Sequence, residues 1–464
     1  MNRRQTDTSI HQLIEAYEAQ LLEGKSAFMD EQAFSQLIHY YGHGLEYEKA
    51  LEIADQALMY HHFSIDFYLQ KAEILLAMRH YESALALLQQ AEPIAPNNSE
   101  LALLRAEVLL YSGKPEEASN HLERLKNNAD TALFCDICLL EAAIAEHRQE
   151  YESMFVLLKT ALQHDSENEE VLEKFGRCIA LTKRYEEGIA VHEAILEDNA
   201  YISIAWYNLG QAYTYLGKYE QATEAYELAY VIDEDFLEAC KECADLFFET
   251  GQYDQALKYY EELCDRQDKD PDLYAAMGRC HYELRQYSNA RAFFFKGIAL
   301  DPLNDDLFYR IAECYMQDDK WLKAVYYLEK AIDVEAENET YFAALGKCFV
   351  ELDQLEEARS ALLEAVRINP EEYLYWMQLA CLMVEIGENE AALETLDMGE
   401  EESGAIELMY CRVACLMAMG KPKQAQYWLN EALTEDFELH PILFEIAPQL
   451  STHPSITAII ACYE

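Results

Sequence analysis

Three pairs of cysteines are spaced so that two thiols could share one face of a helix: Cys135 and Cys138, Cys240 and Cys243, and Cys411 and Cys415. Thiolate sulfur is a preferred ligand of zinc, but a structural zinc site needs four ligands in a tetrahedron. No second pair accompanies any of these pairs at a fixed distance in the sequence. Cysteine also packs as a small apolar residue in protein interiors. We therefore favour packing, and we expect no metal and no cofactor.

Two further groups of polar residues have the composition of a metal site. His39 and His43 are four positions apart, and His61 and His62 follow. Imidazole can bind a transition metal, but we favour polar surface and hydrogen bonding between helices. The segment 265–272 contains four aspartates, yet it lacks the glycine and the closing glutamate of a calcium loop. We interpret this segment as a solvated turn.

The sequence offers no recognisable set of catalytic residues. Gly24-Lys25-Ser26 resembles the end of a phosphate-binding loop, but Ala19 stands where that loop requires a glycine. No stretch resembles a nucleophile elbow. We therefore expect that the chain is not an enzyme.

Most of these residues belong to a repeat of thirty-four positions. From position 203, residues at i, i+3, i+4 and i+7 mark one face of a helix: Trp206, Leu209, Gly210 and Tyr213. After a glycine, a second apolar face contains Tyr219, Ala222, Tyr226 and Ala229. Thirty-four positions after Gly217, Tyr219, Ala222 and Tyr226, the same types return at Gly251, Tyr253, Ala256 and Tyr260. The sequence therefore predicts a helical hairpin that recurs along the chain.

Small residues occupy two columns of this repeat, whose units start at 31, 65, 99, 135, 169, 203, 237, 271, 305, 339, 373 and about 407. The column in the second helix is Ala50, Ala84, Ala118, Met154, Gly188, Ala222, Ala256, Ala290, Ala324, Ala358, Ala392 and Ala425. The column in the first helix is Ile38, Ala72, Ala106, Ala142, Gly176, Gly210, Ala244, Gly278, Ala312, Gly346, Ala380 and Ala414. Small residues at fixed positions let two helices approach closely, so each hairpin should pack tightly.

The columns of Trp, Leu, Gly, Tyr, Ala, Tyr, Ala and Pro at this spacing resemble the tetratricopeptide repeat (TPR). The resemblance covers about twelve units over 31–439 and is strongest over 169–372. It implies an all-α fold, an α-solenoid of antiparallel helix hairpins stacked into a right-handed superhelix. It also implies that the first helices line a concave groove that binds a peptide or a partner protein.

Short segments remain at the two ends of the array. We interpret 1–30 as an N-terminal helix or cap and 440–464 as C-terminal capping helices, because terminal repeats must be covered. Leu443, Ile446 and Leu450 should form one short helix, and Ile456, Ile459, Ile460 and Tyr463 another. The last apolar stripe could instead be a dimer contact, which would make the chain a homo-oligomer. The frame is irregular near 133 and near 399–404, where we favour a loop adjustment over a flexible joint.

By the same resemblance, positions 2, 5, 6, 9, 12 and 13 of each unit face the groove. They place basic, amide and aromatic side chains there: Lys174, Arg177, Tyr207, Asn208, Gln211, Lys241, Arg279, Tyr282, Tyr309, Arg310 and Lys347. Arginine and tyrosine are enriched at binding hot spots. Acidic residues such as Glu242 and Glu313 share these positions, so the charges could instead pair between neighbouring repeats.

The acidic composition limits the kinds of partner that the chain is expected to bind. The chain has 464 residues, with 35 Lys and Arg against 86 Asp and Glu, so its formal net charge is −51. Such a charge argues against nucleic acid and against anionic membranes as partners. We find no signal peptide and no membrane span, and the 13 scattered cysteines form no disulfide framework, so we expect a cytoplasmic protein.

Three functional hypotheses remain. The first is a non-enzymatic scaffold or adaptor that binds a partner protein along the groove. The second is an acidic client-holding or assembly chaperone that binds basic or unassembled chains on its outer face. The third, which we favour least, is a metal or redox protein that uses the cysteine-rich helices.

Overall fold

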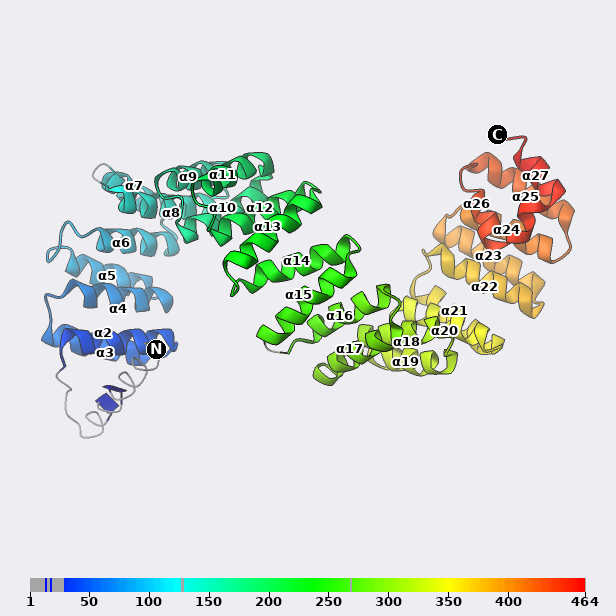
Figure 1. Ribbon diagram of the computed structural model, residues 1–464, viewed down its shortest axis with the longest axis horizontal. Coiled ribbons are helices and arrows are strands. Elements are labelled where there is room, and N and C mark those ends of the chain that lie inside the picture. The colour runs from blue at the N-terminus through cyan, green and yellow to red at the C-terminus, as the bar shows by residue number, and fades with distance from the viewer. Residues whose placement is uncertain (1–12, 15–16, 19–28, 127–128, 268, 464) are drawn as a thin grey trace. The chain divides into compact units, whose positions relative to one another are not determined.

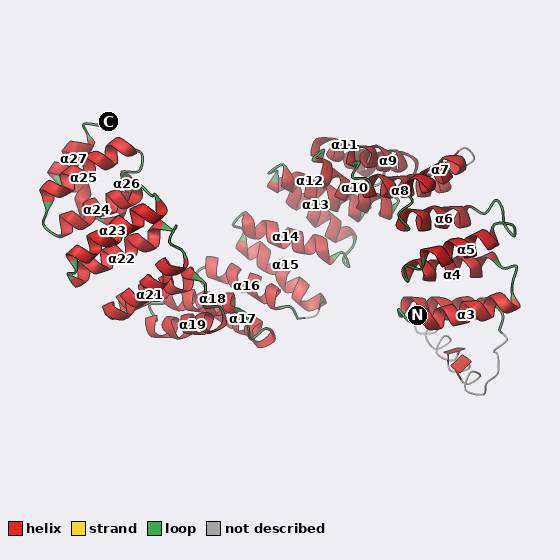
Figure 2. Cartoon of the chain, turned by 180° about the vertical axis from the view of Figure 1, so that it is seen from behind, coloured by secondary structure: helices red, strands yellow, loops and turns green. Residues whose placement is uncertain are grey.

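The computed structural model describes residues 13–14, 17–18, 29–126, 129–267 and 269–463. Within these residues the chain forms helices and loops and no β-strand (Figure 1; Figure 2). The first helices of the hairpins are α2 (Glu31–His43), α4 (Ile65–Ala77), α6 (Ser99–Tyr111), α8 (Thr131–His147), α10 (Glu169–Thr182), α12 (Ser203–Tyr215), α14 (Leu237–Glu249), α16 (Pro271–Glu283), α18 (Asp305–Gln317), α20 (Glu339–Glu351), α22 (Tyr373–Ile386) and α24 (Glu407–Ala418).

The second helices alternate with the first. They are α3 (Tyr47–Tyr60), α5 (Tyr81–Ala91), α7 (Pro115–Lys126), α9 (Tyr151–His164), α11 (Tyr185–Asp198), α13 (Tyr219–Ile232), α15 (Tyr253–Arg266), α17 (Tyr287–Leu300), α19 (Trp321–Val334), α21 (Leu355–Ile368), α23 (Asn389–Ser403) and α25 (Pro422–Glu435). Within each unit, second helices pack on the first helix of the next hairpin, as α11 does on α12 and α21 on α22. The predicted all-α solenoid is therefore confirmed.

The chain divides into two compact units, residues 1–239 and 240–464. This boundary lies away from both irregularities of the sequence frame. Near 133, α8 is longer than the other first helices and begins at Thr131 rather than at 135. Gly399 lies inside α23, where its backbone packs against Trp376 and Leu408. The irregularity near 133 is therefore absorbed in a helix, whereas the segment 399–404 includes the end of α23, which Gly404 caps with a left-handed backbone.

The small residues of the repeat lie where the two helices of a hairpin meet. The alanines at 50, 84, 118, 222, 256, 290, 324, 358, 392 and 425 are all completely buried. In α16 the contact is closer still, because a Cβ atom on Gly278 would lie 2.3 Å from the ring of Phe294. Interiors pack densely, so the size of these residues fixes the distance between the helices.

The turn inside each hairpin contains one residue with a left-handed backbone. These residues are Leu45, Arg79, Gly113, Gln149, Lys183, Gly217, Gly251, Arg285, Asp319, Asp353, Gly387 and Gly420. Only glycine adopts this conformation without a steric cost. The turn geometry is therefore imposed by the hairpin even where the sequence supplies no glycine.

Helical segments pack on the last hairpin, but they differ from the predicted helices at Leu450 and at Tyr463, which lies in a turn. Leu443 and Ile446 lie in α26 (Pro441–Ile446), whereas Leu450 lies in a separate 3-10 helix, η1 (Pro448–Thr452), because Pro448 begins a new element. The last helix, α27 (Pro454–Ile460), buries Ile456 and Ile460 in the same core as α24 and α25. The apolar side chains of Ile456 and Ile460 are therefore covered by other parts of the chain.

At the N-terminal end, Tyr17 is buried in one core with Phe34 and Leu37 of α2. Most of the predicted cap at 1–30 lies outside the described residues. No described helix combines the length and the apolar character that crossing a bilayer requires.

Candidate functional site

Four first helices of the second unit enclose a cavity of about 320 Å³, which we call the groove pocket. Its lining comes from α16, α18, α20 and α22: Tyr282, Tyr309, Glu313, Met316, Gln317, Thr340, Ala343, Ala344, Lys347, Tyr375 and Gln378. Three of the predicted groove residues, Tyr282, Tyr309 and Lys347, are therefore brought together. Side chains at equivalent positions of successive repeats converge here because the first helices lie side by side.

The tyrosines give this pocket rigid aromatic walls. The ring of Tyr309 lies 5.0 Å from that of Tyr341, and the ring of Tyr282 meets Tyr287 edge-on at 5.5 Å. Burial raises the pKa of Tyr309 to about 12, so its hydroxyl stays protonated and can donate a hydrogen bond. Burial also raises the pKa of the Glu313 carboxyl, although Arg310 acts in the opposite direction.

Three of the predicted groove cations are paired with carboxylates of the chain. Lys174 contacts Glu170 at 2.7 Å, on the same helix. Arg177 pairs with Glu146 of α8, which belongs to the preceding repeat. Arg310 lies between Asp306, at 3.3 Å, and Glu313, at 3.0 Å. Of these three, Arg177 pairs between neighbouring repeats, as the alternative interpretation expects, whereas Lys174 and Arg310 pair within their own helices.

The other three predicted cations differ. Lys241, Arg279 and Lys347 are exposed, and none forms an ion pair with a carboxylate of the described residues. The guanidinium of Arg279 instead lies 5.2 Å from the ring centre of Phe248. A binding role for these three cations stays a prediction.

The remaining predicted residues, Tyr207, Asn208 and Gln211, belong to α12 of the first unit. Asn208 is buried, and its amide donates a 2.8 Å hydrogen bond to the carbonyl of Leu172 in α10. It also fills the space above Gly176. Tyr207 packs on Tyr226 and Phe236, and Gln211 is half-buried. Asn208 thus joins two first helices, and a binding role for the other two stays a prediction.

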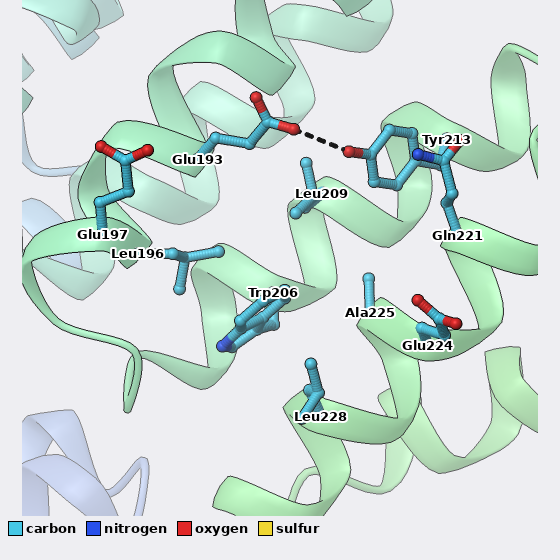
Figure 3. Close-up of a pocket in the computed structure, with 10 residues that line it drawn as sticks. All are labelled: Glu193, Leu196, Glu197, Trp206, Leu209, Tyr213, Gln221, Glu224, Ala225 and Leu228. Atoms are coloured by element: carbon cyan, nitrogen blue, oxygen red, sulfur yellow. Dashed lines mark hydrogen bonds between the residues drawn. The ribbon is translucent and has the colours of Figure 1, made fainter.

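A second cavity, of about 570 Å³, lies in the first unit between α11 and α13, over α12 (Figure 3). We call it the acidic furrow. Its lining is Glu193, Leu196, Glu197, Trp206, Leu209, Tyr213, Gln221, Glu224, Ala225 and Leu228. Glu193, Glu197 and Glu224 form no ion pair with a described cation, while Leu196, Trp206 and Leu228 supply apolar surface. From the sequence, Trp206 and Tyr213 mark one face of a helix, and the pattern does not predict this cavity.

Hydrogen bonds fix the furrow's aromatic side chains. The Tyr213 hydroxyl donates to a carboxylate oxygen of Glu193 at 2.9 Å, as the dashed line in Figure 3 shows. Burial and this bond raise the pKa of Tyr213 to about 12. The indole N–H of Trp206 donates to the carbonyl of Ala200 at 2.9 Å.

His192 anchors α11 beside the furrow. Its side chain is completely buried against the ring of Phe175, and neither ring nitrogen has a hydrogen-bond partner. Burial therefore lowers the pKa of His192 to about 4, since a charged imidazole would lose its hydration there.

Most cysteines pack singly, as the sequence predicted. The sulfur of Cys135 contacts the carbonyl of Ala161, and that of Cys240 the carbonyl of Tyr259. Burial raises the pKa of Cys280, Cys314 and Cys348 to about 12, so these thiols stay protonated. The rings of His39 and His43 stack at 6.2 Å, and Gln70 lies 3.3 Å from His39.

One cysteine pair departs from this pattern. Cys411 and Cys415 are 4.0 Å apart on α24, and Cys381 of α22 approaches Cys411 to 3.9 Å. The three sulfurs all lie within 4.8 Å of one another, and they are the single group of three potential metal ligands within reach in the described part of the chain. The sequence analysis considered Cys411 and Cys415 without Cys381, and so missed the group.

Comparison with known proteins gives matches to repeat families. Profiles described as "Tetratricopeptide repeat" match residues 203–236, 244–305 and 340–372. A profile described as "Anaphase-promoting complex, cyclosome, subunit 3" matches 44–125. No curated protein sequence matches the chain significantly.

Several solved structures match the chain at low sequence identity. A chain of the APC/C hetero-tetramer Cut9-Hcn1 is 13% identical over 94% of this chain and 96% of its own, with a TM-score of 0.36. YrrB, a TPR protein with an unusual peptide-binding site, is 17% identical over 40% of this chain and 95% of its own, with a TM-score of 0.34. MamA from Desulfovibrio magneticus RS-1 is 23% identical over 36% of this chain and 93% of its own, with a TM-score of 0.33.

Hairpins of thirty-four residues, stacked through columns of small residues, define an α-solenoid repeat protein. Three stretches of the chain, 203–236, 244–305 and 340–372, match the tetratricopeptide repeat family. Proteins of this family act as scaffolds for protein–protein interaction, which supports a protein or peptide partner here.

Proposed function

We propose that the chain is a non-enzymatic scaffold that binds an extended segment of a partner protein in the groove pocket of the second unit. The observation that carries this proposal is the combination of an aromatic cavity with the unpaired ammonium group of Lys347 at its edge. A peptide with an apolar side chain and a neighbouring carboxylate fits this combination. The apolar group would displace water from Tyr282, Tyr309 and Tyr375, and the carboxylate would meet Lys347.

Arg279 and Lys241 provide further positive charge for an acidic partner segment. Both are unpaired cations on first helices of the second unit, so an acidic segment longer than the pocket would find further charge there. Charged partners are recognised faster and more selectively when the potentials are complementary. The net charge of −51 argues against nucleic acid and anionic membranes as partners in this proposal.

Affinity purification from the native cell tests the groove pocket. Arg279→Glu with Lys347→Glu should lower recovery of the partner at least tenfold, because two attractive charges become repulsive. Lys423→Glu is the matched control, since Lys423 is an exposed cation on a second helix, α25. Equal recovery with all three proteins would refute the groove assignment.

The acidic furrow supports the alternative function, an acidic holding or assembly chaperone for basic or unassembled chains. Three unpaired carboxylates surround exposed apolar surface there, which suits a segment with Lys or Arg beside an apolar side chain. We propose this chaperone function only for the acidic furrow and not for the groove pocket.

Fluorescence anisotropy measures whether the chain binds a cationic, reduced and unfolded model protein, and so tests the furrow. Glu197→Gln with Glu224→Gln should weaken binding about tenfold, and salt should weaken the unmodified protein's binding because exposed charges are screened. Glu220→Gln, which removes an exposed carboxylate of α13 outside the furrow, is the control. Binding that is insensitive to both salt and the double substitution would count against a furrow site.

We propose a cytoplasmic location. Apart from Cys240 and Cys243, the cysteines are free thiols, three of them in mutual contact, and a reducing compartment preserves thiols in that state. The burial of Ile456 and Ile460 within the chain favours capping over a dimer contact through α27. Sedimentation at several protein concentrations would test whether a homo-oligomer forms by another surface.

A further inference from the structure

Two neighbouring first helices of the second unit bring three thiols together. Cys381 lies on α22, and Cys411 and Cys415 lie one turn apart on α24, a helix that contacts α22 directly. The Cys381 and Cys411 sulfurs are 3.9 Å apart, and those of Cys411 and Cys415 are 4.0 Å apart. We propose that these three sulfurs bind one thiophilic d10 metal ion, Zn²⁺ or Cu⁺.

The separations between the sulfurs fit this chemistry. A metal–sulfur bond of about 2.3 Å places the sulfurs about 3.8 Å apart in a tetrahedron and about 4.0 Å apart in a trigonal plane. The two separations of 3.9 and 4.0 Å lie close to these values, and all three sulfurs lie within 4.8 Å of one another. The sulfurs therefore need little movement to reach a common ion.

The types of ligand select the class of ion. Thiolates are soft ligands, which favour Cu⁺ and Zn²⁺ over hard cations such as Mg²⁺ and Ca²⁺. No histidine nitrogen or carboxylate oxygen of a described residue joins the three sulfurs in the group. The chain thus supplies three sulfurs, which completes a trigonal Cu⁺ site and leaves one position open on Zn²⁺.

The site has a route to solvent. Cys411 and Cys415 are almost completely buried, but Cys381 is half-buried and borders a cavity of about 270 Å³. Lys347 and Gln378 line both this cavity and the groove pocket. An ion can therefore enter from the groove side, where a water molecule could also fill the open position on Zn²⁺.

The other buried cysteines of first helices provide the contrast. Cys280, Cys314 and Cys348 occur once in each helix, and none belongs to a group of three ligands. In the thiol cluster, binding replaces three S–H bonds with three metal–sulfur bonds and releases up to three protons to solvent. No electron is transferred, so no oxidant or reductant is needed.

Metal titration of the full chain tests the proposal. The tag-free protein is stripped with a chelator under anaerobic, reducing conditions and titrated with Zn²⁺ or Cu⁺ against a competing chromophoric chelator. We expect one equivalent of at least one ion to bind, and X-ray absorption should show sulfur neighbours at about 2.3 Å. Tight binding of Zn²⁺ alone or of Cu⁺ alone identifies the ion, and both results support the site.

Variants separate the cluster from the other thiols. Cys381→Ala and Cys415→Ala should each weaken binding at least a hundredfold, whereas Cys348→Ala, the loss of a single buried thiol on α20, should leave binding unchanged. Binding below a tenth of an equivalent, or binding that all three variants retain, overturns the proposal.

Alkylation of the unmodified protein provides a readout that does not depend on the folding of a variant. The bound ion should slow alkylation of Cys381 at least tenfold, while the exposed thiol of Cys462 keeps its rate. Equal rates at Cys381 with and without the ion would contradict the site.

Discussion

The groove pocket and the acidic furrow are two cavities built from the same repeat, and they differ in the charged groups that have no ion-pair partner among the described residues. In the groove pocket, tyrosines surround a cavity with an unpaired lysine, Lys347. In the acidic furrow, leucines and Trp206 are surrounded by unpaired carboxylates. The first is lined by first helices alone, whereas the second lies between two second helices. The buried small residues hold the hairpins together and do not determine which side chains face solvent. The same fold can therefore present two surfaces of different chemistry.

Gly278→Ala should have the largest effect and should act on the unit that holds the groove pocket. The new Cβ atom would lie 2.3 Å from the Phe294 ring, so α16 and α17 must separate. We expect a loss of about 2–3 kcal/mol in the free energy of unfolding, the usual size of overpacking in a core. Urea denaturation followed by circular dichroism measures it.

Gly42→Ala is the control for that substitution. Gly42 is also helical, but a Cβ atom there would meet nothing within 4 Å. Because alanine favours helix over glycine, stability should rise by about 0.5–1 kcal/mol. A loss at Gly42 as large as that at Gly278 would show that the close contact with Phe294 is not the cause.

Acid should destabilise the unit that holds the acidic furrow through His192. Its folded pKa is about 4, against 6.5 for an unperturbed histidine. The stabilising contribution of the neutral ring is therefore present above pH 6.5 and is lost as the pH falls toward 4. Between pH 7 and pH 5 this loss amounts to about 2 kcal/mol.

His192→Leu removes this titration and keeps a buried side chain of similar size. The difference in unfolding free energy between pH 7 and pH 5 should therefore be about 2 kcal/mol smaller in the variant. The same pH dependence in both proteins would mean that His192 is hydrated or hydrogen-bonded in solution.

The hairpin turns, which both units share, should show the smallest effects. Leu45 has a left-handed backbone with φ of 59° and an exposed side chain, so Leu45→Gly should raise stability by about 1 kcal/mol. Gly251 has φ of 77° and open space around it, so Gly251→Ala should lower stability by about 1 kcal/mol. Thermal unfolding of both variants measures the two changes in stability. If both substitutions raised stability, or both lowered it, backbone strain could not be their common cause.

The repeat frame was predictable because helix packing imposes a period on the sequence. Eleven first helices begin at the expected positions, and α8 differs because its inserted residues extend the helix. The groove pocket was predicted in part: Tyr282, Tyr309 and Lys347 were expected, while Tyr375 and Gln378 lie in a weaker unit. Asn208 shows the limit of such a prediction, since its position in the repeat does not reveal that its amide is bonded to Leu172.

The furrow and the thiol cluster depend on contacts between repeats, which a single period does not encode. The cluster nevertheless left a signal. Cys381 and Cys415 are thirty-four positions apart, in the same column as Lys347, and Cys411 lies one turn before Cys415. Pairing cysteines between adjacent repeats, instead of within one helix, would have found it.

Site-specific photo-crosslinking in the native cell tests the central claim most directly. A photoreactive amino acid replaces Ala344, in the groove pocket, or Leu228, in the acidic furrow. We predict a covalent adduct with a partner protein from position 344 that Lys347→Glu abolishes and Lys423→Glu does not. An adduct from position 228 alone, or one from position 344 that survives Lys347→Glu, would contradict binding in the groove pocket.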